Sequence, residues 1–347
     1  MPDLFSDSNG VFFNKLGITN AQELATQEAN FSWIKLSQLN DRGGVPGGKF
    51  DKAHFQEIHK TLFGKIYPWA GETRADRQFQ GHKASYATGN KEVMVYAPYT
   101  DIDKNLKALA DQLEIENYLK GLPLNKFIDR AAFYLDQYNY THAFREGNGR
   151  TLQGAFTQLG YEAGYSLDFF SLNKKEDYNL ARDLGMVRQY GPPESSQNLE
   201  ELKNMFRMIT SPLQTKEAEQ IRNLPAAPSP ELSEDLLKIE VKREFDVTGI
   251  RLMEMLPALR GMESPVDFQI RLTAVRFNQN DLFQHKETFT KVVKAVITHP
   301  LVKPGSQDYK DARRFDQAIA QIEKIAIVND QKLGEKLKQK PSGPKLR

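Results

Sequence analysis

The chain has 347 residues, a net charge of +2, and a composition that is 39% hydrophobic and 27% charged. This length accommodates one large domain or two ordinary ones, and the composition is typical of a globular chain. The absence of cysteine excludes disulfides, thiolate zinc sites and cysteine nucleophiles. No secretory signal opens the sequence, and no run of about 18 apolar residues predicts a membrane span. We therefore expect a cytoplasmic protein, with export into another cell through a C-terminal signal left open.

Helices are predicted at the start of the chain. Apolar residues recur at roughly helical spacing over 20–40, where Asn20 is a suitable N-cap and Glu23 completes a capping box. A glycine-rich loop follows, and residues 51–63 read as a second helix that Asp51 opens.

Between the predicted helices of the first 200 residues, one stretch has the pattern of β-strands rather than of a helix. Residues 75–98 contain Gly81, Gly89 and a β-branched, alternating run, which predicts a short hairpin or extended flap. Helical spacing returns over 101–119, and 126–140 is apolar enough to predict a helix buried on several faces. A further helix is expected over 150–163, with Gly164 as its C-cap.

Composition also predicts how the chain is divided. The run LPAAPSPELSED that starts at Leu224 is typical of a linker, and the lysine-rich end with few apolar residues is typical of a disordered tail. We expect a mainly α chain with a first domain, a Pro-rich linker, a helical C-terminal domain and a basic tail, at 5–205, 206–230, 231–330 and 331–347. The C-terminal region is expected to bind a further partner, and its basic tail leaves nucleic-acid, membrane-surface and secretion-machine contacts open.

The segment HAFREGNGR at 142–150 has the residue types of an anion-binding catalytic site. A buried helix delivers His142 at its end, a glycine turn follows, and a second helix begins at once. The first turn of that helix offers unpaired N–H groups and the positive end of the helix dipole. Glycine lets an anion approach these groups closely, and Arg150 adds donors suited to phosphate oxygens. The segment therefore predicts a polyphosphate site.

Two other side chains of the segment fit that site. Glu146 beside an anion hole makes sense with Mg²⁺ between them, because Mg²⁺ prefers carboxylate and phosphate oxygens together. His142 can take a proton from a hydroxyl near neutral pH. Taken singly, a histidine at a helix end is more often a cap or a packed side chain, Gly-Asn-Gly is usually only a turn, and Arg145 and Glu146 are typical of a solvated face. A metal site of His142 and Glu146 is a further alternative, against which the glycine turn and the lack of a nearby third ligand argue.

The segment resembles the signature of the Fic family, His-x-Phe-x-(Asp/Glu)-Gly-Asn-Gly-Arg-x-x-Arg, at every position except the last. Asn139 and the runs at 67–74 (YPWAGETR) and 14–19 (NKLGIT) also look like Fic-domain sequence, so the resemblance covers roughly residues 5–205. It implies a mainly helical Fic fold with a β-hairpin flap.

The resemblance implies that the chain transfers AMP from ATP to a Tyr, Thr or Ser hydroxyl of a target protein. It implies that His142 is the general base and that Glu146 holds Mg²⁺ against the phosphates. Structural roles are implied for Phe144 and Asn139. The phosphates are then bound by Gly147, Asn148, Gly149, Arg150 and Gln153, and the target is docked by flap residues Met94, Val95, Tyr96 and Ala97.

Gln153 stands where the family has its second arginine. Glutamine can hydrogen-bond a phosphate but cannot neutralise it, and a charge-assisted bond is about twice as strong as a neutral one. We therefore expect looser orientation of ATP. Two alternatives follow: a Fic enzyme that uses another donor such as UTP or a CDP-alcohol, and a catalytically weak scaffold that binds a partner.

The family's inhibitory motif, Ser/Thr-x-x-x-Glu-Gly/Asn, has no clean match in this chain. Ser196–Glu200 is followed by Glu201, and Thr215–Glu219 is followed by Gln220. An antitoxin-like inhibitor acting in trans is left open, although Gln153 also removes the arginine that anchors such a glutamate.

Overall fold

The computed structural model describes residues 4–80, 83–84, 93–94, 96–172, 178–183 and 199–227, with isolated positions between 233 and 313. The chain divides into two compact units, Met1–Gly191 with Gln197–Leu236 and Pro192–Ser196 with Leu237–Arg347. The helices and strands whose bounds the structure describes lie between Ala21 and Arg222, in the first unit. The helical region and tail predicted for 231–330 and 331–347 lie outside the described residues, apart from isolated positions.

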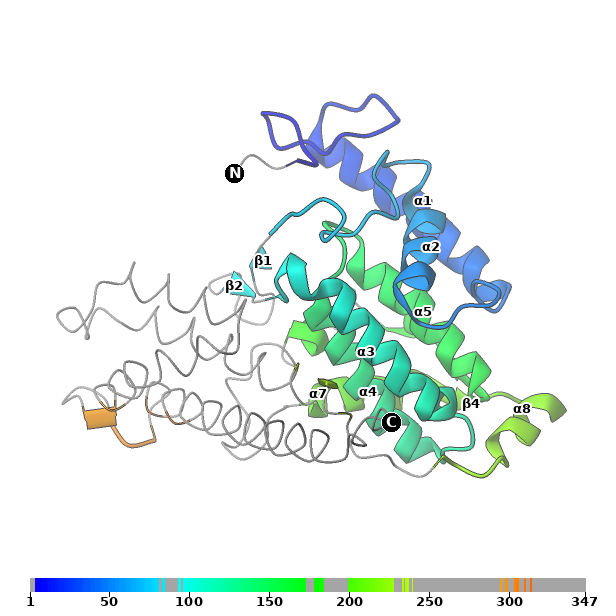
Figure 1. Ribbon diagram of the computed structural model, residues 1–347. Helices are drawn as coiled ribbons and strands as arrows, with labels where there is room; N and C mark the ends of the chain where they lie inside the picture. Colours follow the sequence, from blue (N-terminus) through cyan, green and yellow to red (C-terminus); the bar gives the residue numbers. More distant parts are fainter. Residues whose placement is uncertain are drawn as a thin grey trace, which may run out of the picture. The chain divides into compact units, whose positions relative to one another are not determined.

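The first unit is mainly helical (Figure 1). Helices α1 (Ala21–Asp41) and α2 (Lys52–Phe63) begin where the sequence predicts. The side chain of Asn20 accepts a hydrogen bond from the Glu23 N–H at 2.9 Å, and Asp51 accepts one from the His54 N–H at 2.9 Å. Each cap satisfies an N–H that has no acceptor within its helix.

Helix α3 (Ile102–Ile115) lies between two short 3₁₀ turns, Tyr99–Asp101 and Asn117–Leu119. The helix predicted over 101–119 is therefore interrupted near its end, because Asn117, Tyr118 and Leu119 all have positive φ angles. Such angles do not continue a right-handed helix.

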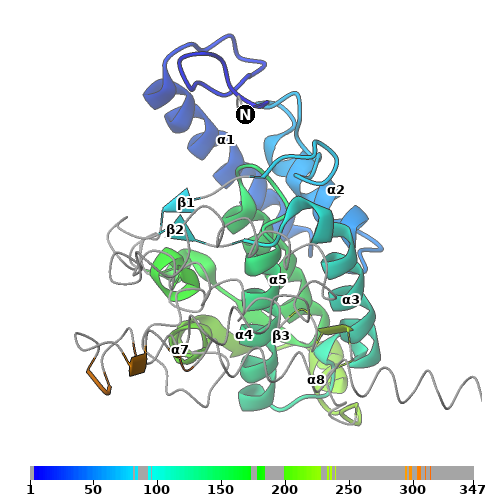
Figure 2. The same ribbon diagram turned by 60° about the vertical axis from the view of Figure 1, so that its left-hand side comes forward.

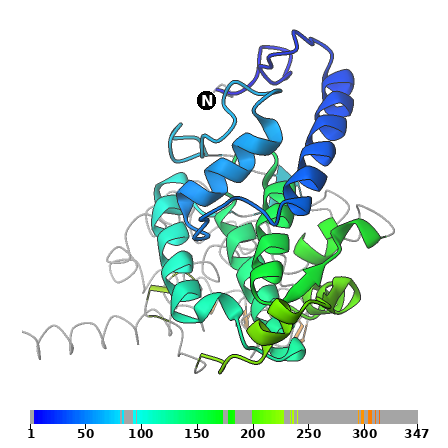
Figure 3. The same cartoon turned by 90° about the vertical axis from the view of Figure 1, so that its right-hand side faces the viewer.

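Helices α4 (Leu124–Thr141) and α5 (Asn148–Glu162) form the centre of this unit (Figures 2 and 3). α4 packs against α3, α5 and α7 (Glu200–Ile209), while α5 also contacts α1 and α2. Burial on several faces of α4 is confirmed, since every residue of α4 from Ala131 onward is buried. The loop that joins α4 to α5 is therefore anchored at both ends by buried helices.

Among its described residues, the first unit also has two small antiparallel sheets. The predicted hairpin is present as β1 (Lys83–Ala84) paired with β2 (Val93–Met94). A second pair joins β3 (Tyr165–Leu167) to β4 (Thr210–Pro212).

Regular structure continues into the range in which the sequence predicts a linker. After α7 the chain adds β4 to β3, and α8 (Lys216–Arg222) then packs on α5. The residues up to Arg222 therefore belong to the first unit. None of the described helices is long and apolar enough to cross a membrane.

Candidate active site

His142 is held in an unusual backbone conformation directly after α4. Its φ and ψ of 44° and 58° are left-handed, which is uncommon for a residue other than glycine. Arg74, only 2% exposed, holds the carbonyls around it: Nε donates to the His142 oxygen at 2.7 Å, and Nη2 to the Thr141 and Ala97 oxygens at 3.1 and 2.9 Å. Burial lowers the pKa of Arg74 to about 10, which leaves it charged at neutral pH. This charged donor stabilises a conformation that the chain would otherwise avoid.

Gly147 is the N-cap residue of α5, and its position in the structure requires a glycine. Its φ is 82°, and a Cβ at this position would lie 2.5 Å from the Phe63 ring. The first hydrogen bond of the helix runs from the Thr151 N–H to the Gly147 oxygen at 3.0 Å. The N–H groups of Asn148, Gly149 and Arg150 therefore have no acceptor within α5, as the anion hole requires.

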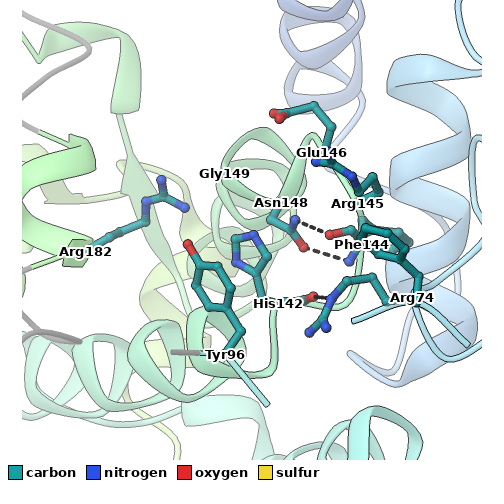
Figure 4. Close-up of a pocket in the computed structure, with 10 residues that line it drawn as sticks. Arg74, Tyr96, His142, Phe144, Arg145, Glu146, Asn148, Gly149 and Arg182 are labelled. Atoms are coloured by element: carbon teal, nitrogen blue, oxygen red, sulfur yellow. Dashed lines mark hydrogen bonds between the residues drawn. The ribbon is translucent and has the colours of Figure 1, made fainter. Parts of the chain in front are cut away.

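Asn148 closes the loop on itself. Its side-chain oxygen accepts from the Phe144 N–H at 2.9 Å, and its Nδ2 donates to the Phe144 oxygen at 2.7 Å (Figure 4). Phe144 is 1% exposed and stacks on His59 with ring centroids 4.1 Å apart. Both side-chain groups of Asn148 thus shape the loop, which leaves its backbone N–H for the phosphate contact that the sequence predicts.

His59 fixes the Glu146 carbonyl, a role that the sequence did not indicate. Nδ1 accepts from the Gly71 N–H at 2.9 Å, so Nε2 carries the hydrogen and donates to the Glu146 oxygen at 3.0 Å. Burial, with a smaller contribution from the charge of Arg150, lowers the pKa of His59 to about 4. The ring is therefore neutral at physiological pH.

The residues around His142 enclose a pocket at the N-terminus of α5 (Figure 4). Its lining combines cations, one carboxylate, aromatic rings and the start of a helix. It consists of Arg74, Phe79, Tyr96, His142, Phe144, Arg145, Glu146, Asn148, Gly149 and Arg182. The structure thus brings together the predicted base, the predicted metal ligand and part of the predicted anion hole.

The predicted flap residues differ in their placement. Tyr96 is buried and stacks on the His142 ring, with centroids 3.6 Å apart and planes 11° from parallel. The Ala97 N–H donates to the Tyr140 oxygen at 2.9 Å, and its carbonyl accepts from Arg74. Because both backbone groups of Ala97 are engaged, this residue is not available for strand pairing with a target. Met94 lies in β2, and Val95 lies outside the described residues.

Arg150 and Gln153 do not line the His142 pocket. The Arg150 guanidinium pairs with Glu28, donates to Ser32 Oγ at 2.6 Å and lies over the Phe63 ring at 4.8 Å. Gln153 is buried in α5, and its side-chain oxygen has no hydrogen bond with any described group. The Arg150 charge, which the sequence predicts to contact phosphate, is thus paired with a carboxylate of α1.

Glu146 is the residue suited to a metal. Its side chain is 39% exposed, lies 3.9 Å from Arg150 and accepts from the Gly147 N–H at 2.9 Å. Nowhere in the described part of the chain do three or more metal-ligating side chains gather. A single carboxylate beside a phosphate site fits Mg²⁺, which is commonly held by one or two carboxylates and substrate phosphates.

Comparison with known proteins identifies the family. The Fic/DOC family profile matches residues 49–158. The chain is 34% identical over 174 residues to the probable protein adenylyltransferase Fic of Escherichia coli, a match that covers 50% of this chain and 79% of that protein. It is 38% identical over 175 residues to the protein adenylyltransferase VbhT of Bartonella schoenbuchensis, covering 50% of this chain but only 34% of VbhT. The chain therefore belongs to the Fic/DOC family.

Solved structures agree with this family and with the mainly helical fold. The N-terminal Fic domain of a VirB-translocated Bep effector protein from Bartonella quintana, with bound ADP, is 29% identical. It matches with a TM-score of 0.52 over 62% of this chain and 97% of that one. Another structure of the N-terminal Fic domain of a VirB-translocated Bep effector protein from Bartonella quintana matches with a TM-score of 0.51 over 62% of this chain and 95% of that one.

Proposed function

We propose that the chain is a protein adenylyltransferase that moves AMP from ATP to a Tyr, Thr or Ser hydroxyl of a target protein. The observation that carries this proposal is one pocket that contains the His142 imidazole, the Glu146 carboxylate and the N-terminus of α5. The names of the relatives and the ADP bound to the Bartonella quintana domain support a nucleotide as the ligand.

The nucleotide would lie with its phosphates against the first turn of α5. The N–H groups of Asn148 and Gly149 and the helix dipole favour negative charge there. Glu146 would hold Mg²⁺, which neutralises phosphate charge when bound. Because His59 and Asn148 fix the carbonyls of the loop, these donors are in place before the nucleotide arrives.

His142 would act as the general base. The imidazole takes the proton of the target hydroxyl, whose oxygen then forms a bond to the α-phosphorus of ATP. The bond from that phosphorus to the bridging oxygen breaks, and pyrophosphate leaves with the electron pair. Stacking on Tyr96 and the contact of Arg74 with the His142 carbonyl orient the ring for this transfer.

Radiolabelled nucleotides test this proposal. The full chain is incubated with a lysate and ATP labelled at either the α- or the γ-phosphate, beside a His142→Ala control whose urea unfolding matches that of the wild type. We expect the wild type to increase protein labelling from α-labelled ATP over that of the lysate alone, and His142→Ala to give no such increase. Labelling from γ-labelled ATP, which the kinases of the lysate produce, should be the same with both proteins. An increase in α-labelling that persists in the control contradicts the role of His142, and an increase in γ-labelling with the wild type over the control contradicts AMP transfer. If α-labelled ATP gives no product, labelled UTP and CDP-choline decide between another donor and a scaffold.

The remaining proposals concern the parts around this site. Residues 5–205 would carry the transferase, and the region 231–330 would bind a partner. The relation to a VirB-translocated effector domain supports export into another cell as an alternative to a purely cytoplasmic role. Co-purification from the source cell would test for an antitoxin-like inhibitor in trans.

A further inference from the structure

Arg182 lines the His142 pocket although it lies far outside the signature segment. It belongs to a short helical stretch, residues 178–183, and is 4% exposed. Figure 4 shows its guanidinium pointing toward Tyr96 and His142, on the side of the pocket opposite Arg74. The pocket therefore has a cation that no role assigned so far uses.

The contacts of Arg182 hold it in place through neutral groups. Nη1 donates to Asn139 Oδ1 at 3.2 Å and Nη2 to Asn179 Oδ1 at 2.8 Å, and the guanidinium lies 4.7 Å from the centre of the Tyr178 ring. Nε is buried and has no hydrogen bond with any described group. A buried donor without an acceptor is costly, and a ligand oxygen would remove this cost.

The position of Arg182 indicates what that ligand is. A Cβ built on Gly149 would lie 3.3 Å from Arg182 Nη1, so the guanidinium packs against the first turn of α5. The Tyr178 hydroxyl donates to the Gly149 oxygen at 3.1 Å and ties the two segments together. The start of α5 already carries partial positive charge, so an anion that binds between it and the guanidinium would be stabilised by both.

We propose that Arg182 binds a phosphate oxygen of the donor nucleotide and supplies the positive charge that Gln153 does not. This proposal rests on the proposed function for the identity of the nucleotide, but binding can be measured without transfer. Arginine suits this task because its charge is permanent and its planar fork matches phosphate geometry.

Calorimetric titration of the full chain tests the proposal, with ATP added directly and adenosine measured by competition. Adenosine serves as the second ligand because it lacks phosphates. We expect Arg182→Gln to weaken ATP binding about 10- to 100-fold, as for the loss of a charge-assisted hydrogen bond, and to leave adenosine binding within about 2-fold. Arg182→Lys should retain part of the ATP affinity. The matched control, Arg207→Gln, removes an exposed charge of α7 outside the pocket and should leave the affinity for both ATP and adenosine unchanged.

Each outcome decides the proposal. Unchanged ATP binding by Arg182→Gln overturns it, and so does an equal loss for ATP and adenosine, which would show a structural role. If Arg182→Gln does not fold, the same comparison applies to Arg182→Met, which keeps an aliphatic side chain and removes the charge; an ATP-selective loss supports the proposal and no loss overturns it. A wild type that binds no ATP overturns this proposal and the proposed function together. ATP binding that is sensitive to Arg182 without AMP transfer overturns only the proposed function.

Discussion

Protonation of His59 should destabilise the first unit as the pH falls. Burial lowers the pKa of this ring from 6.5 to about 4, so the unfolded chain binds a proton more readily than the folded one. The neutral ring therefore contributes stability that is fully present above pH 6.5 and is lost as the pH falls toward 4. For these two values, the loss between pH 7 and pH 5 amounts to about 2 kcal/mol.

Urea unfolding at pH 7 and pH 5 measures this loss when wild type is compared with His59→Gln. Glutamine does not titrate, so the variant lacks this part of the pH dependence whatever its stability at pH 7. His54, whose pKa burial also lowers, is present in both proteins, and its contribution cancels. The chain has two tryptophans, Trp33 and Trp69, and both report on this unit by fluorescence. Equal pH dependence in wild type and variant would refute the argument.

Three further predictions concern the loop and the helix that follows it. Arg74→Lys replaces a guanidinium that donates to three carbonyls with a single ammonium group, and should lower the free energy of unfolding in urea by about 2 kcal/mol or more. A decrease below about 0.5 kcal/mol would show that these hydrogen bonds do not hold the loop in place. Gly147→Ala should lower the free energy of unfolding by about 1–3 kcal/mol, because residue 147 has a positive φ and the added Cβ would meet the Phe63 ring. A variant with the same thermal unfolding midpoint as the wild type would contradict this prediction. Gln153→Arg, made in an Arg182→Gln background, should recover part of the lost ATP affinity in titration. A further loss would show that the two positions do not serve the same phosphates.

The local features of this fold were predictable from the sequence because their causes are local. Asn20 and Asp51 cap helices within three residues of themselves, and the apolar run before His142 identifies a buried helix without knowledge of its neighbours. The placement of the candidate site was predictable for the same reason, since the proposed base, the proposed metal ligand and the glycine turn lie within nine consecutive residues.

The supports of that site were not predictable, because each reaches it through the fold. Arg74 and His59 bond to carbonyls 68 and 87 residues away in sequence, and Arg182 contacts Asn139 at a separation of 43. Arg74 ends the run at 67–74 that resembles Fic-domain sequence, but neither that run nor the neighbours of His59 indicate which carbonyls these side chains bond to. Arg150 shows the converse, since its place in the signature predicts a phosphate contact but not the pairing with Glu28 of α1.

These supports share one consequence for how the site would work. Arg74 binds the His142 carbonyl, His59 binds the Glu146 carbonyl and Asn148 binds the Phe144 carbonyl, so these oxygens of the loop are engaged. Carbonyl oxygens turned toward the pocket would repel phosphate, whereas the N–H groups at the start of α5 attract it. The aromatic stack of His59 on Phe144 keeps this arrangement from relaxing. We therefore expect His59→Gln and Arg74→Lys to weaken nucleotide binding and to lower the transfer rate together, because both would loosen the same preorganised loop.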